Sequence, residues 1–379
     1  MCGATYDRGC TTRTRRVFGG AHHAAARVVM TREGVAVYPH VTAVINAKGG
    51  VQKTTVIAAL AHRAVAEGRR VLVVDLDPQG NCAKALGFAD DPLPDVEPSD
   101  GGAALSHALI TGEPLTPVTI RPGMSVCAGG PLLSKALREI ATWEPARKFQ
   151  ALNTLIEPIA DEFDMVLIDT PPTNLDIQAL TLGVAATVVI PCEIADDTAE
   201  DGVVGALTMV AAARKRGNPT ITVAGVVLAA TRLSHSTFRE RRVARATATE
   251  TKARLHEFDP TVHILTSILR QRADANLVRR HGRSATELLS ADDIALARGQ
   301  RRNLRRLRNT VDSLIDELYP LVAARATDNG LACQLPAVQP VKPHGEEPTE
   351  SSTVDVTETS TPTGVGPDVE TATKEGATK

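Results

Sequence analysis

Short aliphatic runs alternate along most of the chain with longer stretches whose apolar residues recur every three or four positions. The aliphatic runs are VTAVINA (41–47), VLVVDLD (71–77), MVLIDT (165–170), ATVVIPC (186–192), TVAGVVLAAT (222–231) and VHILTSIL (262–269). Runs this apolar are typical of parallel strands that are buried on both faces and joined by helical crossovers. The pattern therefore predicts an α/β fold with a mostly parallel twisted sheet and helices on both of its faces.

The helices are predicted by apolar periodicity and by the glycines that end it. Residues 54–67 and 199–216 form two such segments, followed by Gly68 and Gly217, and a third segment spans 147–162. The last helix has apolar residues at three- and four-residue spacing, namely Leu304, Leu307, Val311, Leu314, Ile315 and Leu318. We expect this amphipathic helix to pack back on the sheet.

The two ends of the chain lack the alternating pattern. Residues 1–39 are expected to be irregular. They either form a flexible basic arm or, if Met30 is the true start, include an upstream part that is not translated in the protein. Residues 40–325 form the predicted folded domain. Residues 326–379 are rich in Pro, Thr, Glu and Gly and nearly free of large hydrophobic residues, so we expect a disordered acidic tail.

Composition narrows the class of protein. The content of 43% hydrophobic and 23% charged residues is ordinary for a soluble globular protein, and 3% aromatic residues argues against extensive base stacking. The 6 cysteines include no C-x-x-C pair, so neither a zinc site nor a disulfide framework is indicated, and a cytoplasmic location fits best. No apolar run approaches the ~20 residues that cross a bilayer, so the chain is not expected to span a membrane.

The candidate chemistry lies at the junction of the first strand and the first helix, in AKGGVQKT (47–54). In a P-loop, G-x-x-x-x-G-K-[ST], backbone N–H groups surround the phosphates, the lysine reaches the β/γ oxygens and the hydroxyl binds Mg²⁺. Here Ala47 and Gln52 replace both glycines, but Lys53 and Thr54 remain at a helix N-terminus, which favours anions. The segment is therefore a candidate phosphate loop.

The segment KGGVQKTT (48–55), with its additional lysine, resembles the deviant phosphate loop of the ParA/MinD superfamily, and in particular that of ParA/Soj-type partition ATPases. The resemblance continues in VLVVDLDPQGN (71–81) and FDMVLIDTPPTN (163–174) and covers roughly residues 41–322. It implies ATP and Mg²⁺ as cofactors. The nucleotide-binding residues implied are Lys48, Gly49, Gly50, Val51, Gln52, Lys53, Thr54, Thr55, Pro191 and Arg270.

The resemblance also implies individual roles at this site. Asp77 orients the attacking water and Lys48 reaches across a dimer interface to the partner's nucleotide, so both are expected to be catalytic. Thr54, Asp75 and Asp169 are the expected Mg²⁺ site, in which Asp75 supports the site and Asp169 holds the metal through water. The aspartates follow aliphatic runs, and ligands bind at the carboxyl ends of strands in such sheets.

Arginines cluster in three segments of the second half of the chain. One interpretation is that they form solvated helix faces paired with glutamates. The other is a surface that tracks DNA phosphates without reading sequence, which the resemblance favours because the family binds DNA when bound to ATP. The expected DNA-binding residues are Arg239, Arg241, Arg242, Arg245, Arg279 and Arg280, and a third cluster lies within 301–308.

The resemblance predicts an ATP hydrolase with weak intrinsic activity that forms a homodimer on ATP and binds DNA non-specifically. It would partition a plasmid or chromosome at the nucleoid with a ParB-like centromere-binding partner that stimulates hydrolysis. Two alternatives stay open. One is an ATP-dependent adaptor with little turnover, since Gln52 alters the loop. The other is a MinD-like membrane-cycling ATPase, against which the acidic C-terminal segment argues because anionic lipid would repel it.

Overall fold

The computed structural model describes residues 13–15, 28–30, 36–88, 99–172, 174–194, 199–230, 238–270, 278, 281, 283–292 and 294–327. Its strands are β1 (Arg13–Arg15), β2 (Val28–Met30), β3 (Ala36–Val44), β4 (Val71–Asp75), β5 (Val118–Arg121), β6 (Met124–Cys127), β7 (Met165–Asp169), β8 (Ala185–Glu193), β9 (Thr222–Ala230) and β10 (Ile264–Arg270). Its helices are α1 (Lys53–Ala66), α2 (Asn81–Ala85), α3 (Ala103–Thr111), α4 (Leu133–Ala141), α5 (Pro145–Ile156), the 3₁₀ helix η1 (Glu157–Glu162), α6 (Leu175–Val184), α7 (Ala199–Lys215), α8 (Phe238–Phe258), α10 (Ala285–Ser290) and α11 (Arg298–Thr327).

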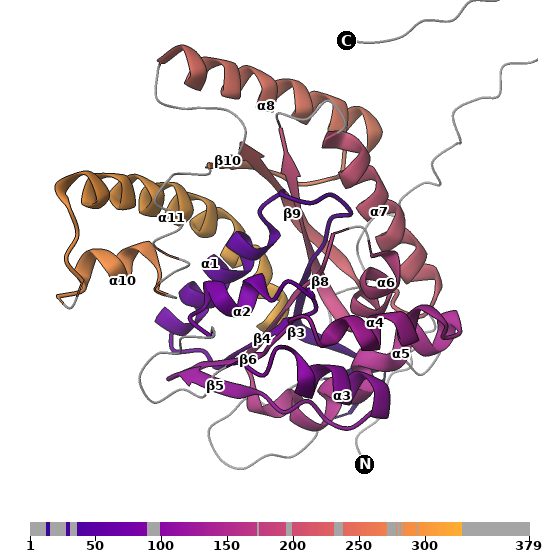
Figure 1. The fold of residues 1–379 in the computed structure, drawn as a ribbon. Helices are drawn as coiled ribbons and strands as arrows, with labels where there is room; N and C mark the ends of the chain where they lie inside the picture. The colour runs from indigo at the N-terminus through magenta and orange to yellow at the C-terminus, as the bar shows by residue number, and fades with distance from the viewer. Residues whose placement is uncertain are drawn as a thin grey trace, which may run out of the picture. The chain divides into compact units, whose positions relative to one another are not determined.

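The main sheet has the strand order β10-β9-β8-β3-β7-β4-β6-β5 (Figure 1). Neighbouring strands are parallel from β10 to β6, and only the edge strand β5 is antiparallel to its neighbour. The predicted mostly parallel sheet is therefore confirmed. The strands β5 and β6 were not predicted, because each has only four residues and β5 is half exposed at the edge of the sheet.

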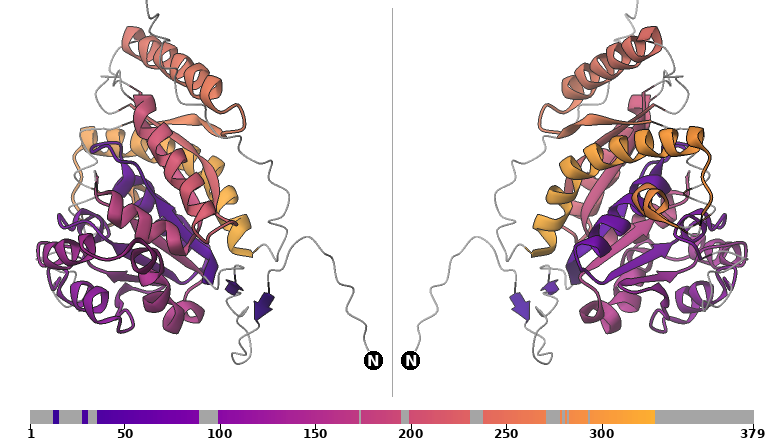
Figure 2. Two further views of the ribbon diagram at one scale, coloured as in Figure 1. Left: turned by 90° about the vertical axis from the view of Figure 1, so that its right-hand side faces the viewer. Right: turned by 90° about the vertical axis from the view of Figure 1, so that its left-hand side faces the viewer.

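The core lies on both faces of the sheet, as the aliphatic runs predicted. Val41 and Ala43 on β3, with Ile45 directly after it, join a hydrophobic cluster that includes residues of α3 to α7, whereas Val44 joins the opposite cluster with α1 and α11. This alternation follows from the period of two along a strand. Figure 2 shows α7 in front of the sheet in one view and α1 with α11 in front in the other. In the described part of the chain, no helix is both long and apolar enough to cross a membrane.

The N-terminal segment differs from the expectation in part. Residues 1–39 were expected to be irregular, yet β2 pairs antiparallel with both β1 and the start of β3, which begins at Ala36 rather than at Val41. Backbone hydrogen bonds form this ladder, so it needs no long apolar run. The remaining residues before 36 and residues 328–379 lie outside the described residues, and the disorder expected of them stays a prediction.

Candidate nucleotide site

The candidate site residues come together because three strands end in one row. Val44 on β3 is the register partner of Asp169 on β7, and Asp169 is in turn the partner of Asp75 on β4. The phosphate loop that follows β3 therefore begins beside both carboxylates. Since the three strands are parallel, this row lies at the carboxyl edge of the sheet, where ligands bind in such folds.

Lys53 opens α1 and is held over the loop by the loop's own backbone. Its side chain is buried, and Nζ donates to the carbonyl oxygens of Asn46 at 3.0 Å and Lys48 at 2.9 Å. Burial lowers the pKa of Lys53, while the nearby carboxylate of Asp169 acts in the opposite direction. The ammonium is thus oriented at the helix N-terminus, where backbone N–H groups also favour phosphate.

Thr54 and Asp169 form the pair that could hold a metal ion. The Thr54 hydroxyl donates to Asp169 Oδ2 at 2.8 Å. Asp169 is buried, and its Oδ1 receives no hydrogen bond from any of the described residues. Burial raises the pKa of Asp169 to about 6. A hydroxyl beside a carboxylate oxygen with unused acceptor capacity fits Mg²⁺, which prefers oxygen ligands and keeps several waters.

Asp75 supports the turn that carries Asp77. Its Oδ1 accepts the Asp77 N–H at 3.0 Å, and its Oδ2 accepts the N–H groups of Cys82 and Ala83 in α2 at 3.0 and 3.1 Å. Burial, together with the charge of Asp169, raises the pKa of Asp75 to about 8. In this arrangement Asp75 orients backbone, and its expected support of a metal ion stays a prediction.

Gln52 occupies the loop position at which P-loops carry glycine. Its backbone is left-handed, with φ 71° and ψ 26°, and among the described residues it alone has a positive φ without being glycine. Glycine favours this conformation because it lacks a Cβ. The Gln52 side chain turns back onto α1, where its Oε1 accepts the Thr55 hydroxyl at 2.8 Å. The loop therefore keeps a glycine-type backbone despite the glutamine.

Asn46 is a site residue that the sequence reasoning missed. It is fully buried, its Nδ2 donates to the Pro191 carbonyl at 2.7 Å, and its Oδ1 accepts the Lys48 N–H at 2.8 Å. Asn46 thereby connects the loop to β8 and orients the backbone of Lys48. The one signal in the sequence was a polar side chain at the end of an aliphatic run. Pro191, expected at the nucleotide, reaches the loop through its carbonyl.

The other residues expected at the nucleotide lie in or near the loop. Lys48 is partly exposed, Gly49 and Gly50 are exposed, and Val51 is buried. Arg270 ends β10 beside the last residue of β9, and its side chain is outside the described part.

The expected DNA-binding arginines are described only in part. Arg242 and Arg245 are exposed on α8. The side chains of Arg239 and Arg241, and the whole of Arg279 and Arg280, lie outside the described residues.

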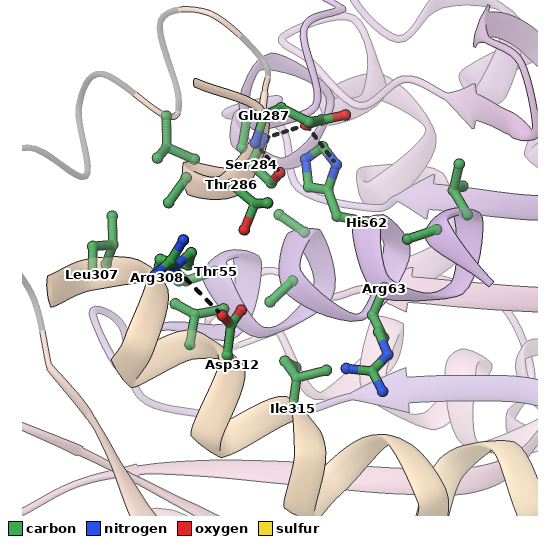
Figure 3. Close-up of a pocket in the computed structure, with 18 of the residues that line it drawn as sticks. Thr55, His62, Arg63, Ser284, Thr286, Glu287, Leu307, Arg308, Asp312 and Ile315 are labelled. Carbon is green, nitrogen blue, oxygen red and sulfur yellow. Dashed lines mark hydrogen bonds and ion pairs between the residues drawn. The ribbon is translucent and has the colours of Figure 1, made fainter. Parts of the chain in front are cut away.

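A cavity of about 480 Å³ adjoins the first turn of α1 and was not predicted from the sequence. It lies between α1, α10 and the N-terminal part of α11, and Thr54 and Thr55 line one end of it. Figure 3 shows His62 and Glu287 directed toward each other at its wall, with 3.4 Å between His62 Nδ1 and Glu287 Oε2. Burial lowers the pKa of His62 to about 4, so this imidazole is neutral at pH 7.

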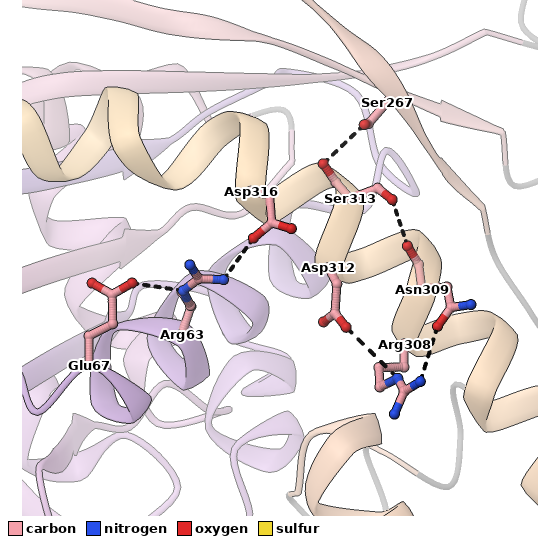
Figure 4. Close-up of polar contacts among 8 residues, drawn as sticks. All are labelled: Arg63, Glu67, Ser267, Arg308, Asn309, Asp312, Ser313 and Asp316. Atoms are coloured by element: carbon pink, nitrogen blue, oxygen red, sulfur yellow. Dashed lines mark hydrogen bonds and ion pairs between the residues drawn. The ribbon is translucent and has the colours of Figure 1, made fainter.

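Polar contacts tie the helices around the cavity to the sheet. Arg63 on α1 donates to Glu67 and to Asp316 on α11, both at 2.8 Å (Figure 4). The Ser267 hydroxyl on β10 donates to the Ser313 carbonyl at 3.1 Å. The wall formed by α11 is therefore anchored to both α1 and the sheet.

The sheet order and the loop after β3 define a P-loop nucleotide-binding fold. A family model for an AAA domain matches residues 39–223. The chain is 34% identical over 189 residues to the chromosome-partitioning ATPase Soj of Thermus thermophilus, and this match covers 49% of the present chain and 67% of Soj. It is 32% identical over 195 residues to the chromosome partitioning protein ParA of Caulobacter vibrioides, and this match covers 50% of the present chain and 68% of ParA. The chain therefore belongs to the ParA/Soj family of P-loop ATPases, which confirms the resemblance.

Solved structures show the same fold at lower identity. The ParA of pNOB8 has a TM-score of 0.56 and 20% identity, over 75% of this chain and 98% of that one. McdA of Cyanothece without nucleotide has a TM-score of 0.54 and 20% identity, over 73% of this chain and 98% of McdA. A McdA variant solved as its ATP complex has a TM-score of 0.54 and 18% identity, over 74% and 96%.

Proposed function

We propose that this chain is a partition ATPase that binds ATP with Mg²⁺, dimerises in that state and binds DNA without sequence preference. One observation carries the proposal: the Thr54 hydroxyl is hydrogen-bonded to Asp169, whose second oxygen is buried without a partner among the described residues, beside the oriented ammonium of Lys53. Phosphate-binding and metal-binding groups thus face the same loop. The relatives named Soj and ParA, described as partitioning proteins, support the same role.

Different residues of the site would bind the phosphates, hold the metal ion and orient the attacking water. Lys53 would reach the β/γ oxygens while backbone N–H groups of the loop and of the α1 N-terminus surround the phosphates. Thr54 and Asp169 would hold Mg²⁺, which, when bound, neutralises charge on the phosphates. Asp77 would orient the attacking water, and its backbone is already fixed by the carboxylate of Asp75.

The cavity beside Thr55 offers room for the nucleoside half of ATP. Its volume of about 480 Å³ falls in the range of roughly 300–1,000 Å³ that is usual for small-molecule sites. Ala59→Phe would fill part of it and should weaken ATP binding while leaving tripolyphosphate binding unchanged. Ala253→Phe, on the exposed face of α8, is the matched control. Unchanged ATP binding by Ala59→Phe would place the nucleoside elsewhere, and equal losses for both ligands would show that the substitution disturbs the phosphate loop instead.

Dimerisation, DNA binding and a partner belong to the same proposal. Lys48, whose backbone is oriented by Asn46, would act on the nucleotide of the second protomer. The exposed Arg242 and Arg245 on α8 would contact DNA phosphates, so that site selection would come from a ParB-like centromere-binding partner that also stimulates the weak hydrolysis. This cycle places the protein at the nucleoid in the cytoplasm.

Two substitutions test the assignment of binding and hydrolysis. Lys53→Ala should abolish ATP binding, because it removes the cation at the β/γ oxygens. Asp77→Ala should bind ATP and form dimers but hydrolyse slowly, because only the group that positions water is lost. Lys135→Ala and Asp201→Ala are exposed controls on α4 and α7. ATP hydrolysis by Asp77→Ala at the wild-type rate would show that Asp77 does not have this role.

A further inference from the structure

Three loops beside the candidate site meet backbone to backbone, with glycine at each contact. The turn after Asp77 contributes one glycine, the segment before α3 two, and the segment after β6 two. We call this contact the glycine junction, formed by Gly80, Gly101, Gly102, Gly129 and Gly130. Close approach of two backbones is one of the situations in which only glycine fits.

Gly129 lies directly on the turn that carries Asp77. A Cβ at this position would be 2.6 Å from the Asp75 carbonyl oxygen and 3.0 Å from the Asp75 carboxyl carbon, and closer still to the carbonyl oxygen of Asp77. These are backbone atoms or a buried carboxyl group, so no flexible side chain can rotate away. Any residue other than glycine must therefore displace the turn by several tenths of an ångström.

The segment before α3 holds Gly129 in place from the other side. A Cβ at Gly130, whose φ is 146°, would be 2.5 Å from the Gly101 carbonyl oxygen. A Cβ at Gly102, whose φ is 87°, would be 3.1 Å from the carbonyl carbon of Gly129. The Leu132 N–H also donates to the Gly101 carbonyl at 3.1 Å. The start of α4 is thus fixed to the start of α3, with Gly129 pressed against the Asp77 turn.

We propose that Gly129 is a positioning residue for ATP hydrolysis, because it lets the loop after β6 pack against the turn and so fixes the Asp77 carboxylate. The turn is held between two supports, the Asp75 carboxylate at the Asp77 N–H and Gly129 at the Asp77 carbonyl. Lys53 and Thr54 lie on α1 and are not among the groups nearest to Gly129, so we expect ATP binding to survive the loss of this contact. The inference rests on the role proposed for Asp77.

Gly129→Ala tests the inference. A misplacement of about 1 Å can cost on the order of 100-fold in rate, so a smaller displacement should lower kcat by about 10-fold or more. The affinity for a slowly hydrolysed ATP analogue should stay within about threefold of the wild type, since the loop and Lys53 are untouched. Gly205→Ala on α7 is the matched control, because its Cβ would meet nothing within 4 Å.

A double-mutant cycle separates positioning from general damage. If Gly129 acts through Asp77, Gly129→Ala should cause no further loss in the Asp77→Ala background, measured as single-turnover hydrolysis. If it acts elsewhere, the two losses should multiply, and the inference is wrong. Wild-type turnover in Asp77→Ala would instead refute the role proposed for Asp77, and intact ATP binding by Lys53→Ala would count against the proposed function, so these failures can be told apart.

Gly102→Ala keeps the inference testable if Gly129→Ala does not fold, as judged by its thermal unfolding. Its Cβ presses on Gly129 at 3.1 Å rather than on the turn itself, so a smaller decrease in kcat is expected, again absent in the Asp77→Ala background. Unchanged kcat in every variant that folds would overturn the inference.

Discussion

Gln52 should store backbone strain that glycine would release. Its φ of 71° places a residue with a Cβ in the left-handed region, at a cost of about 1–2 kcal/mol. Gln52→Gly removes that cost but also the hydrogen bond from the Thr55 hydroxyl, worth about 0.5–1.5 kcal/mol. The two effects nearly cancel, so this variant alone is uninformative about the strain.

The comparison of Gln52→Gly with Gln52→Ala isolates the backbone term, because both variants lack the hydrogen bond. Glycine gains about 1–2 kcal/mol from the left-handed conformation and loses about 0.4–1 kcal/mol through the greater entropy of its unfolded chain. We therefore expect the glycine variant to be more stable than the alanine variant by about 1 kcal/mol. Urea denaturation followed by circular dichroism measures the difference as a shift in midpoint at constant slope.

Gln150 provides the control with the opposite sign. It is exposed in the right-handed helix α5, where alanine should exceed glycine in stability by about 1 kcal/mol. If Gln52→Ala is as stable as Gln52→Gly, or more stable, then Gln52 is not left-handed in solution and the glycine-type backbone of the loop is refuted.

Three further predictions concern the dimer, the DNA surface and pH. Lys48→Ala should bind ATP, unlike Lys53→Ala, but lose ATP-dependent dimerisation or turnover; normal dimers by light scattering and normal turnover would contradict its role across the interface. Replacing Arg242 and Arg245 with alanine should make the slope of log K against log salt shallower by up to about 2 and leave ATP binding intact; an unchanged slope would remove α8 from the DNA surface. Burial lowers the pKa of His40 to about 4, below its ordinary value. As the pH falls, this imidazole is therefore protonated in the unfolded chain before it is protonated in the folded protein. The contribution of His40 to the free energy of unfolding is therefore fully present above about pH 6.5 and decreases by up to about 3 kcal/mol toward pH 4. His40→Leu should make this pH dependence shallower; an equally steep dependence in the variant would contradict the assignment to His40.

Local pattern was enough to predict the parallel sheet and the positions of several candidate site residues along it. The six aliphatic runs predicted β3, β4, β7, β8, β9 and β10 as parallel strands of one sheet, without their order. They also placed Asp75 and Asp169 at strand ends, and the helical pattern placed Lys53 at a helix start, where the structure has them. Such predictions succeed because hydrophobic periodicity and helix-terminal signals depend on residues close in sequence.

Tertiary structure alone decided which distant groups meet. The Asn46 side chain binds a carbonyl 145 positions away, and the short strand β6 carries Gly129 onto the Asp77 turn. The cavity beside Thr55 is lined by α1, near the start of the domain, and by α10 and α11, near its end. None of these contacts has a local signature, because each depends on the order of strands in the sheet and on which helices cover the same face. The left-handed backbone of Gln52 belongs with them: the loop geometry imposes a conformation that the residue itself disfavours.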